Sequence, residues 1–185
     1  MRNCRQETLN AAELNTSELV ELLQKSAVEH LTTYRQLQAR DFGSVATIVT
    51  TDFEALYAYK RGDYQRCLQL STQNVQKTLN ATRMIQVFTL PVFIHMFDDD
   101  IVSLIALTLI VDPECRRYSV NVGISQLTLS LYLMTQCQLM LRHSVTSLVQ
   151  TLDYIEVAQR RHPASYTLNH LIQKMTERKI LSYIT

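Results

Sequence analysis

The chain has 185 residues, of which 46% are apolar, but only 3 are Gly and 3 are Pro. Sandwich, barrel and propeller folds need a tight turn after every short strand, and Gly and Pro supply much of the chemistry of such turns. The composition therefore argues against these all-β classes and, with 26 Leu and 15 Gln residues, favours long helices. The net charge of +1 gives no general reason to expect a nucleic-acid or anionic-membrane partner.

The charge is unevenly distributed along the chain. Residues 1–115 carry 10 Lys or Arg and 14 Asp or Glu, a net charge of −4, whereas residues 116–185 carry 8 and 3, a net charge of +5. Ends of opposite sign can steer a partner or place one copy of the chain head to tail on another. A self-assembling helical oligomerisation domain is therefore one alternative function.

We expect a single all-helical domain over residues 1–185, because a chain of this length forms one domain and no Ser-rich or Pro-rich linker divides it. Residues 1–15 precede the first periodic segment and are expected to be disordered or irregular. The Cys residues lie far apart, without a CxxC pair or a leader peptide ahead of them, so reduced thiols and a cytoplasmic location are expected. These residues are Cys4, Cys67, Cys115 and Cys137.

Three helices are predicted in the first part of the chain. Apolar residues recur at every third or fourth position over residues 16–40, about 45–60 and 64–79. Ser44 follows the helix breaker Gly43 and is a good cap for the second of these helices.

The next segment, residues 84–111, is very apolar and is interrupted by Pro91 and by the acidic trio Asp98-Asp99-Asp100. Since proline disrupts a helix interior, a helix near residues 84–97 should bend or restart at Pro91. A second helix should run over 101–111, with the three aspartates capping and neutralising its amino end. This helix is apolar on all sides, so we expect it at the centre of the fold.

A long segment without charge follows. Between Arg117 and Arg142 lie 24 uncharged residues, a length sufficient to cross a bilayer. The segment contains many Ser, Thr and Gln residues, which make it too polar for a membrane span. We therefore predict a buried core helix that begins near Ile124 and no membrane span.

The last two helices are expected over about 145–161 and 163–184, because Ser144 is a good cap and Pro163 suits the first turn of a helix. The chain then has seven or eight helices joined by short links, which makes successive helices antiparallel neighbours. The expected fold is all-α, an array of antiparallel helix hairpins. The core-like pattern continues to Ile184, so either the last helix caps the array or the chain is a fragment of a longer protein.

One segment carries a specific motif. In Phe53–Leu68, FEALYAYKRGDYQRCL, Gly62 permits a tight reversal, Asp63 caps the second helix and Tyr64 closes over the turn. This segment resembles the helix-turn-helix centre of a tetratricopeptide repeat. The structural turn is therefore assigned to Gly62, Asp63 and Tyr64.

The match to this family covers about residues 48–81. Small residues at Ala55 and Cys67 would let the paired helices approach closely, whereas Ala58 and Ser71 stand where the family has larger residues, and no second clean copy follows. The resemblance implies a tetratricopeptide-like α-α superhelix. In that family a concave groove, lined by the first helix of each pair, binds an extended peptide or a partner helix.

Six residues are candidates for binding a protein partner. Two tyrosines of the repeat-like segment could line a recognition groove, although packed helices bury tyrosines equally well. Two pairs of arginines form basic concentrations, although cations also favour helix carboxyl ends without any partner. The six are Tyr57, Tyr59, Arg116, Arg117, Arg160 and Arg161.

The residues predict no catalytic, cofactor or metal site. The chain has no Gly-rich phosphate loop, HExxH or GxSxG motif. His95 lies three residues before Asp98, as metal ligands can, but a break is expected between them. The predicted function is thus a non-enzymatic scaffold module that binds a protein or peptide. A second alternative is a bundle that encloses a small apolar ligand, with candidate lining residues Met84, Phe88, Phe93, Met96 and Phe97.

Overall fold

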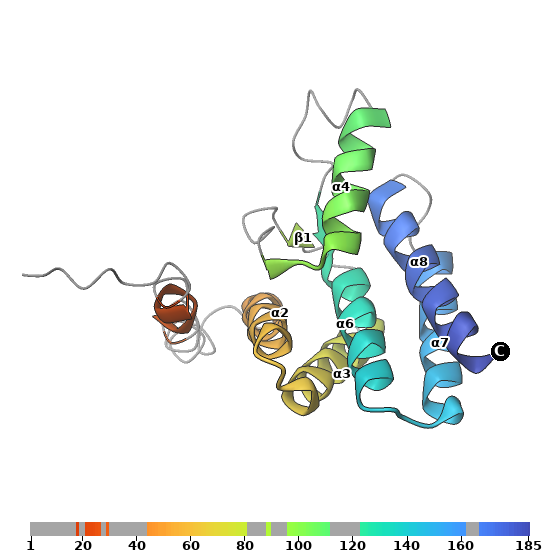
Figure 1. The fold of residues 1–185 in the computed structure, drawn as a ribbon, viewed down its shortest axis with the longest axis horizontal. Helices are drawn as coiled ribbons and strands as arrows, with labels where there is room; N and C mark the ends of the chain where they lie inside the picture. The colour runs from red at the N-terminus through yellow and green to blue at the C-terminus, as the bar shows by residue number, and fades with distance from the viewer. Residues whose placement is uncertain are drawn as a thin grey trace, which may run out of the picture.

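The computed structural model describes residues 18, 21–26, 29, 44–80, 88–89, 96–111, 123–161 and 167–185. Helices occupy most of these residues, which confirms the all-α class (Figure 1). They are α2 (Ser44–Lys60), α3 (Tyr64–Asn80), α4 (Asp99–Val111), α6 (Gln126–Met140), α7 (Val145–Arg161) and α8 (Thr167–Ile184). Residues 18, 21–26 and 29 are also helical and lie within the expected first helix, the rest of which is outside the described residues.

Helix α6 lies at the centre of the fold. The α2–α3 hairpin packs on one side of it, and α7 and α8 pack on the other (Figure 1). Nearly every residue from Gln126 to Gln138 is buried, polar residues included. Its first turn is capped by Ser125, whose Oγ accepts a hydrogen bond from the Thr128 backbone N–H at 3.2 Å. The predicted buried core helix is therefore confirmed.

Opposite faces of α6 contribute to two clusters of buried apolar side chains. Tyr132 joins the cluster that includes Phe53 of α2 and Ile101 of α4. Leu131 joins the cluster that includes Ile155 of α7. Because α6 buries side chains on both sides, it holds the hairpin and the α7–α8 pair in one core.

The prediction that residues 101–111 form the central helix was wrong. The helix exists, but α4 lies at the edge of the fold against α8 (Figure 1). Ile101 and Ile105 are buried, whereas Ile110 and Val111 are 69% and 70% exposed. Polar residues do not keep α6 from the centre, because Thr128, Ser130 and Gln138 find hydrogen-bond partners inside the fold.

The prediction of a helix near residues 84–97 was also wrong at Phe88–Thr89. Phe88–Thr89 form a short strand, β1, that pairs antiparallel with β2, Ile124–Ser125, in the register Phe88 with Ser125 and Thr89 with Ile124. Phe and Thr both favour extended structure, and the nearby Pro91 disfavours helix in the residue before it. Residues 84–87 and 90–95 lie outside the described part of the chain.

Other local predictions agree with the structure. The Ser147 backbone N–H donates to Ser144 Oγ at 3.4 Å, as expected for the cap of α7. Pro163 lies outside the described residues, which resume at Thr167 in α8. Of the helices described, none combines the length and apolar character needed to span a bilayer.

Two of the four cysteines lie within the described residues. Cys67 of α3 and Cys137 of α6 are free and fully buried. A hydrogen bond with Cys67, together with burial, raises the pKa of the Cys137 thiol. No disulfide is formed by these two cysteines, and Cys4 and Cys115 lie outside the described residues.

Candidate interaction site

The turn between α2 and α3 has the geometry that the motif predicts. Gly62 has a φ of 77°, in the left-handed region that favours glycine. The Gly62 N–H donates to the Tyr59 carbonyl at 3.0 Å, and the Asp63 N–H donates to the Ala58 carbonyl at 2.9 Å. This pair of bonds is a Schellman motif, which satisfies the last carbonyls of α2 and reverses the chain. The role assigned to Gly62 is confirmed.

The two residues after Gly62 also take the expected positions. Asp63 Oδ1 accepts a hydrogen bond from the Arg66 backbone N–H at 3.1 Å and so caps α3. The Tyr64 ring meets the Tyr59 ring edge to face, with 5.8 Å between the ring centroids. The turn is thus fixed by a cap and by an aromatic contact across it.

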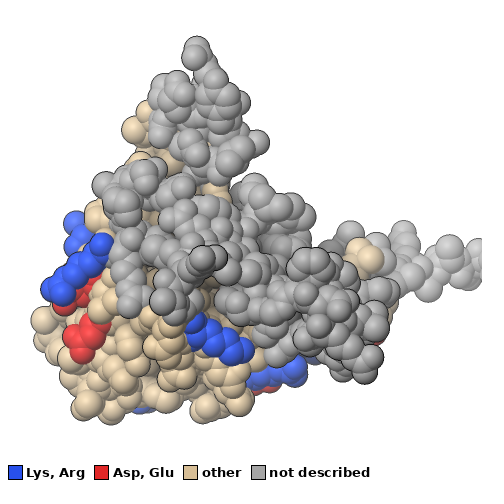
Figure 2. All heavy atoms as spheres, turned by 180° about the vertical axis from the view of Figure 1, so that it is seen from behind, with Lys and Arg blue, Asp and Glu red and all other residues tan. Residues whose placement is uncertain are grey.

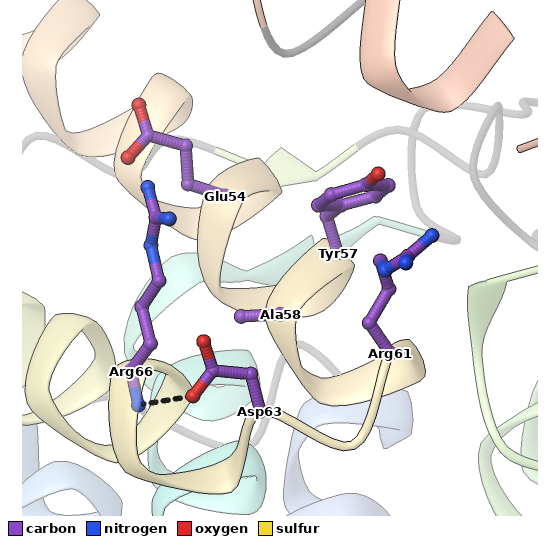
Figure 3. A pocket seen from close by; sticks show the side chains of 6 residues that line it. All are labelled: Glu54, Tyr57, Ala58, Arg61, Asp63 and Arg66. Carbon is purple, nitrogen blue, oxygen red and sulfur yellow. Dashed lines mark hydrogen bonds between the residues drawn. The ribbon is translucent and has the colours of Figure 1, made fainter. Parts of the chain in front are cut away.

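A pocket of about 180 Å³ lies on this hairpin (Figure 3). It is lined by Glu54, Tyr57 and Ala58 of α2, by Arg61 and Asp63 of the turn, and by Arg66 of α3. Glu54 shares one face of α2 with Tyr57 and Ala58, which follow it by three and four residues. The pocket therefore combines an aromatic wall, a small apolar residue and four charged side chains.

The charged side chains of the pocket have different surroundings. Arg61 forms an ion pair with Glu21, and its guanidinium carbon lies 6.0 Å from the centre of the Tyr57 ring. Glu54 is only 7% exposed, and the Arg66 side chain extends toward it (Figure 3). Since the Asp63 carboxylate caps α3, the two guanidinium groups and the Tyr57 ring are the groups best placed to contact a ligand.

Tyr59 points elsewhere, to a junction of α2, α6 and the residues before α4. The hydroxyl groups of Tyr59 and Tyr132 donate to Asp98 Oδ2 at 2.8 and 2.7 Å, and Lys60 Nζ donates to Oδ1 at 3.1 Å. Burial alone would raise the pKa of Asp98, but these three donors outweigh it and hold the pKa below its usual value. Burial and the bond to Asp98 in turn raise the pKa of both phenols.

This junction corrects the prediction that all three aspartates cap α4. The Asp98 side chain binds α2 and α6, and only its backbone carbonyl begins α4, by accepting from the Val102 N–H at 3.0 Å. Asp100 lies in the first turn of α4, where the helix dipole favours an anion, and pairs with Lys179 of α8 at 2.5 Å. The acidic segment therefore ties α4 to the face formed by α2, α6 and α8.

Of the four predicted arginines, only the Arg160 side chain lies within the described part of the chain, and it is not at this site. Arg160 lies on α7 and pairs with Glu156 one turn earlier. The side chain of Arg161 and both Arg116 and Arg117 lie outside what the structure describes. On the face seen in Figure 2, charged side chains of the described residues form small separate groups rather than one extended basic surface.

Sequence reasoning missed Glu54, Arg61 and Arg66 as pocket residues. Glu54 and Arg61 could have been found from the sequence, because positions 54, 57, 58 and 61 follow helical spacing through α2 and into the turn. Arg66 could be added only by placing α3 beside α2. Within the described residues, no group of three His, Cys, Asp or Glu side chains is arranged to hold a metal ion, and His95 lies outside them.

The chain was compared with protein families, curated sequences and solved structures. No family model matches it, and neither the curated proteins nor the solved structures include a significant match.

Proposed function

We propose that the protein is a non-enzymatic, all-helical interaction module that holds a segment of a partner protein in the pocket of the α2–α3 hairpin. The observation that carries the proposal is the pocket itself, where the Tyr57 ring and the guanidinium groups of Arg61 and Arg66 surround a space that fits a side chain. Tyrosine and arginine are the residues that most often dominate protein interfaces. The buried, free thiols of Cys67 and Cys137 fit the reducing cytoplasm that is part of this proposal.

The packing order of the helices supports a tetratricopeptide-like arrangement within this proposal. Helix α3 packs against both α2 and α6, and α7 packs against both α6 and α8. The first helices of successive pairs, α2, α6 and α8, also contact each other in order. Stacked helix pairs have this pattern of contacts, with α4 as an addition to it.

The hairpin pocket is a better candidate than a groove along the first helices at Tyr59. There, Asp98 already accepts hydrogen bonds from side chains of α2 and α6, and Asp100 forms an ion pair with a side chain of α8. A partner would have to replace these charge-assisted hydrogen bonds, each of which is stronger than a neutral one. At the Tyr57 pocket the competing contact is the Arg61–Glu21 ion pair, whose side chains are 49% and 55% exposed and which therefore costs less to replace.

Selection of peptides tests this proposal. A displayed library of random peptides is selected on the full chain, and the affinity of each recovered peptide is measured for Tyr57→Ala and Arg66→Ala. We expect each variant to weaken binding at least about tenfold, as a contact worth about 1.4 kcal/mol would. The matched controls are Tyr183→Ala and Arg178→Ala, which change exposed residues of α8. If no recovered peptide distinguishes the pocket variants from these controls, the proposed site is wrong.

A second candidate function, self-assembly, is favoured by exposed apolar side chains at the end of α4 and at the α6–α7 connection. These two parts of the chain lie at opposite ends of the helices in Figure 1. Leu107, Ile110 and Val111 are exposed at the end of α4, and Met140 and Val145 are exposed where α6 meets α7. Such groups can bury area between copies. Sedimentation at high protein concentration tests this candidate, because a monomer at every salt concentration contradicts it.

A further inference from the structure

A buried carboxyl group lies where α2, α3 and α6 meet. Asp52 of α2 is only 2% exposed. Its Oδ1 accepts two hydrogen bonds, from Asn74 Nδ2 of α3 at 2.7 Å and from Ser130 Oγ of α6 at 2.8 Å. One oxygen atom thus joins three helices, including both helices of the hairpin.

Two other oxygens of this cluster receive no hydrogen bond from the described residues. They are Oδ2 of Asp52 and Oδ1 of Asn74, and both are buried. A buried acceptor without a donor costs about 1–3 kcal/mol, and an ionised carboxylate without a nearby cation costs more. Two such acceptors on side chains that already touch indicate that a donor belongs between them.

A single proton supplies that donor. A carboxylic acid and an amide can pair through two hydrogen bonds, in which the amide N–H donates to the carbonyl oxygen and the acid O–H donates to the amide oxygen. Asn74 already makes the first bond, and the two oxygens without donors are those that the second bond joins. We propose that Asp52 is a neutral acid whose Oδ2 proton is shared with Asn74 Oδ1, and that loss of this proton loosens the α2–α3 hairpin from α6.

The charges nearby agree with this assignment. Burial raises the pKa of Asp52 to about 7, although the hydrogen bonds from Ser130 and Asn74 lower it in part. No charged side chain of the described residues is among the causes of the shift. The other ionisable side chains that the three helices carry are Glu54, Tyr57, Tyr59, Lys60, Tyr64, Arg66, Cys67, Lys77, Tyr132 and Cys137.

The direction of the pH effect follows from proton binding. Below the ordinary pKa of 3.8, Asp52 is protonated in both the folded and the unfolded chain. Between 3.8 and about 7 only the folded chain keeps the proton, so stability falls as pH rises through this range. The unfolding equilibrium constant should rise by about tenfold per pH unit there. Above this range the effect of Asp52 no longer changes with pH.

The substitution Asp52→Asn tests the proposal, because the new amide can donate to Asn74 Oδ1 as the protonated acid does. Unfolding by urea is measured for the full chain and for Asp52→Asn from pH 4 to pH 8. We expect the variant to be more stable than the parent chain at pH 8. The ratio of their unfolding constants should then approach one toward pH 4, by about tenfold per pH unit below about 7. The matched control is Asp63→Asn, which changes an exposed capping carboxylate and should show no such convergence.

A direct measurement on the unchanged chain accompanies this test. The infrared carbonyl band of a protonated carboxylic acid should be present at pH 6, disappear as pH rises past about 7 and be absent from Asp52→Asn. If the variant is less stable than the parent chain at pH 8, or if the band is missing at pH 6, Asp52 is ionised and the proposal is wrong. Neither readout depends on the hairpin pocket or on any partner.

Discussion

Two carboxyl groups lie between α2 and α6, and their environments are opposite. Asp98 accepts hydrogen bonds from two phenols and from the Lys60 ammonium, and its pKa lies below the usual value. Asp52 accepts two bonds from neutral donors on one oxygen and none on the other, and its pKa is raised to about 7. The two carboxyl groups differ in burial, since the Asp98 side chain is 25% exposed and Asp52 is 2% exposed, and in the number and charge of their donors. Both differences favour a proton on Asp52 over one on Asp98.

Replacement of the Asp by Asn tests this difference at both Asp52 and Asp98. Replacement by Asn keeps the shape of the side chain, removes the charge and turns one acceptor into a donor. At Asp52 the new donor faces an amide oxygen, whereas at Asp98 it faces donors. The sign of the stability change should therefore differ between the two sites.

The largest loss of stability is expected for Asp98→Asn. The variant leaves the Tyr59 and Tyr132 hydroxyl groups without their charged acceptor, and we expect a loss of about 2–3 kcal/mol in the free energy of unfolding at pH 7. Urea denaturation measures this loss. Asp99→Asn, which changes a neighbouring exposed residue, is the control. A loss no greater than that of the control would mean that the junction does not hold α4.

The pH dependence of the same variant sharpens the comparison. Because the pKa of folded Asp98 is lowered, its stabilising effect is fully present above the ordinary pKa of 3.8 and is lost as pH falls through the folded value. The difference between the parent chain and Asp98→Asn should therefore shrink at acid pH. The Asp52→Asn variant also approaches the parent chain as pH falls, but it does so from higher stability and over a higher range, between about 7 and 3.8. Differences of the same sign, or lost over the same pH range, at both sites would refute the comparison.

A backbone change in the hairpin should be independent of both carboxyl groups. Gly62→Val forces a β-branched residue into a left-handed conformation, and we expect a loss of about 1–2 kcal/mol at every pH. Apart from Gly62 and its two neighbours in the chain, no heavy atom lies within 4 Å of the position that a Cβ would take, so the cost comes from the backbone conformation. Gly62→Asn, which tolerates this conformation better, is the control and should lose less. If the loss changes between pH 4 and pH 8, the range in which Asp52 is expected to release its proton, the turn is linked to that proton.

The smallest effect is expected at an exposed ion pair. Arg160→Ala removes the pair with Glu156, whose side chains are 73% and 60% exposed, and thermal unfolding should show a change within about 0.5 kcal/mol. The position of Arg160 on α7, away from the hairpin pocket, also predicts unchanged binding of the selected peptides. If Arg160→Ala binds the selected peptides more weakly than the parent chain does, Arg160 belongs to the interaction surface.

The local parts of this fold were predictable from the sequence. Gly62 and Asp63 act through bonds to residues within five positions of themselves, so the hairpin turn could be recognised from a short motif. The burial of α6 was also predictable, because a long segment without charge is too polar for a membrane and must find its hydrogen bonds within the protein.

The junction at Asp98 was not predictable in this way. Asp98 meets Tyr59 and Tyr132, which are 39 and 34 residues away in the sequence. From the sequence, a carboxylate before a helix indicates a cap, and nothing local shows that two phenols from other helices will bind it. The edge position of α4 was missed for a related reason, since an apolar pattern shows that a helix can be buried but not which of several helices will be.

The two free thiols have a practical consequence for studying the hairpin. Cys67 and Cys137 are fully buried on α3 and α6, and the raised pKa of Cys137 makes its thiol a poor nucleophile in the folded chain. A thiol-reactive dye can therefore label them only when the contact between these helices opens. The rate at which Cys67 and Cys137 react therefore reports how often that contact opens, and no residue of the core has to be replaced to measure it.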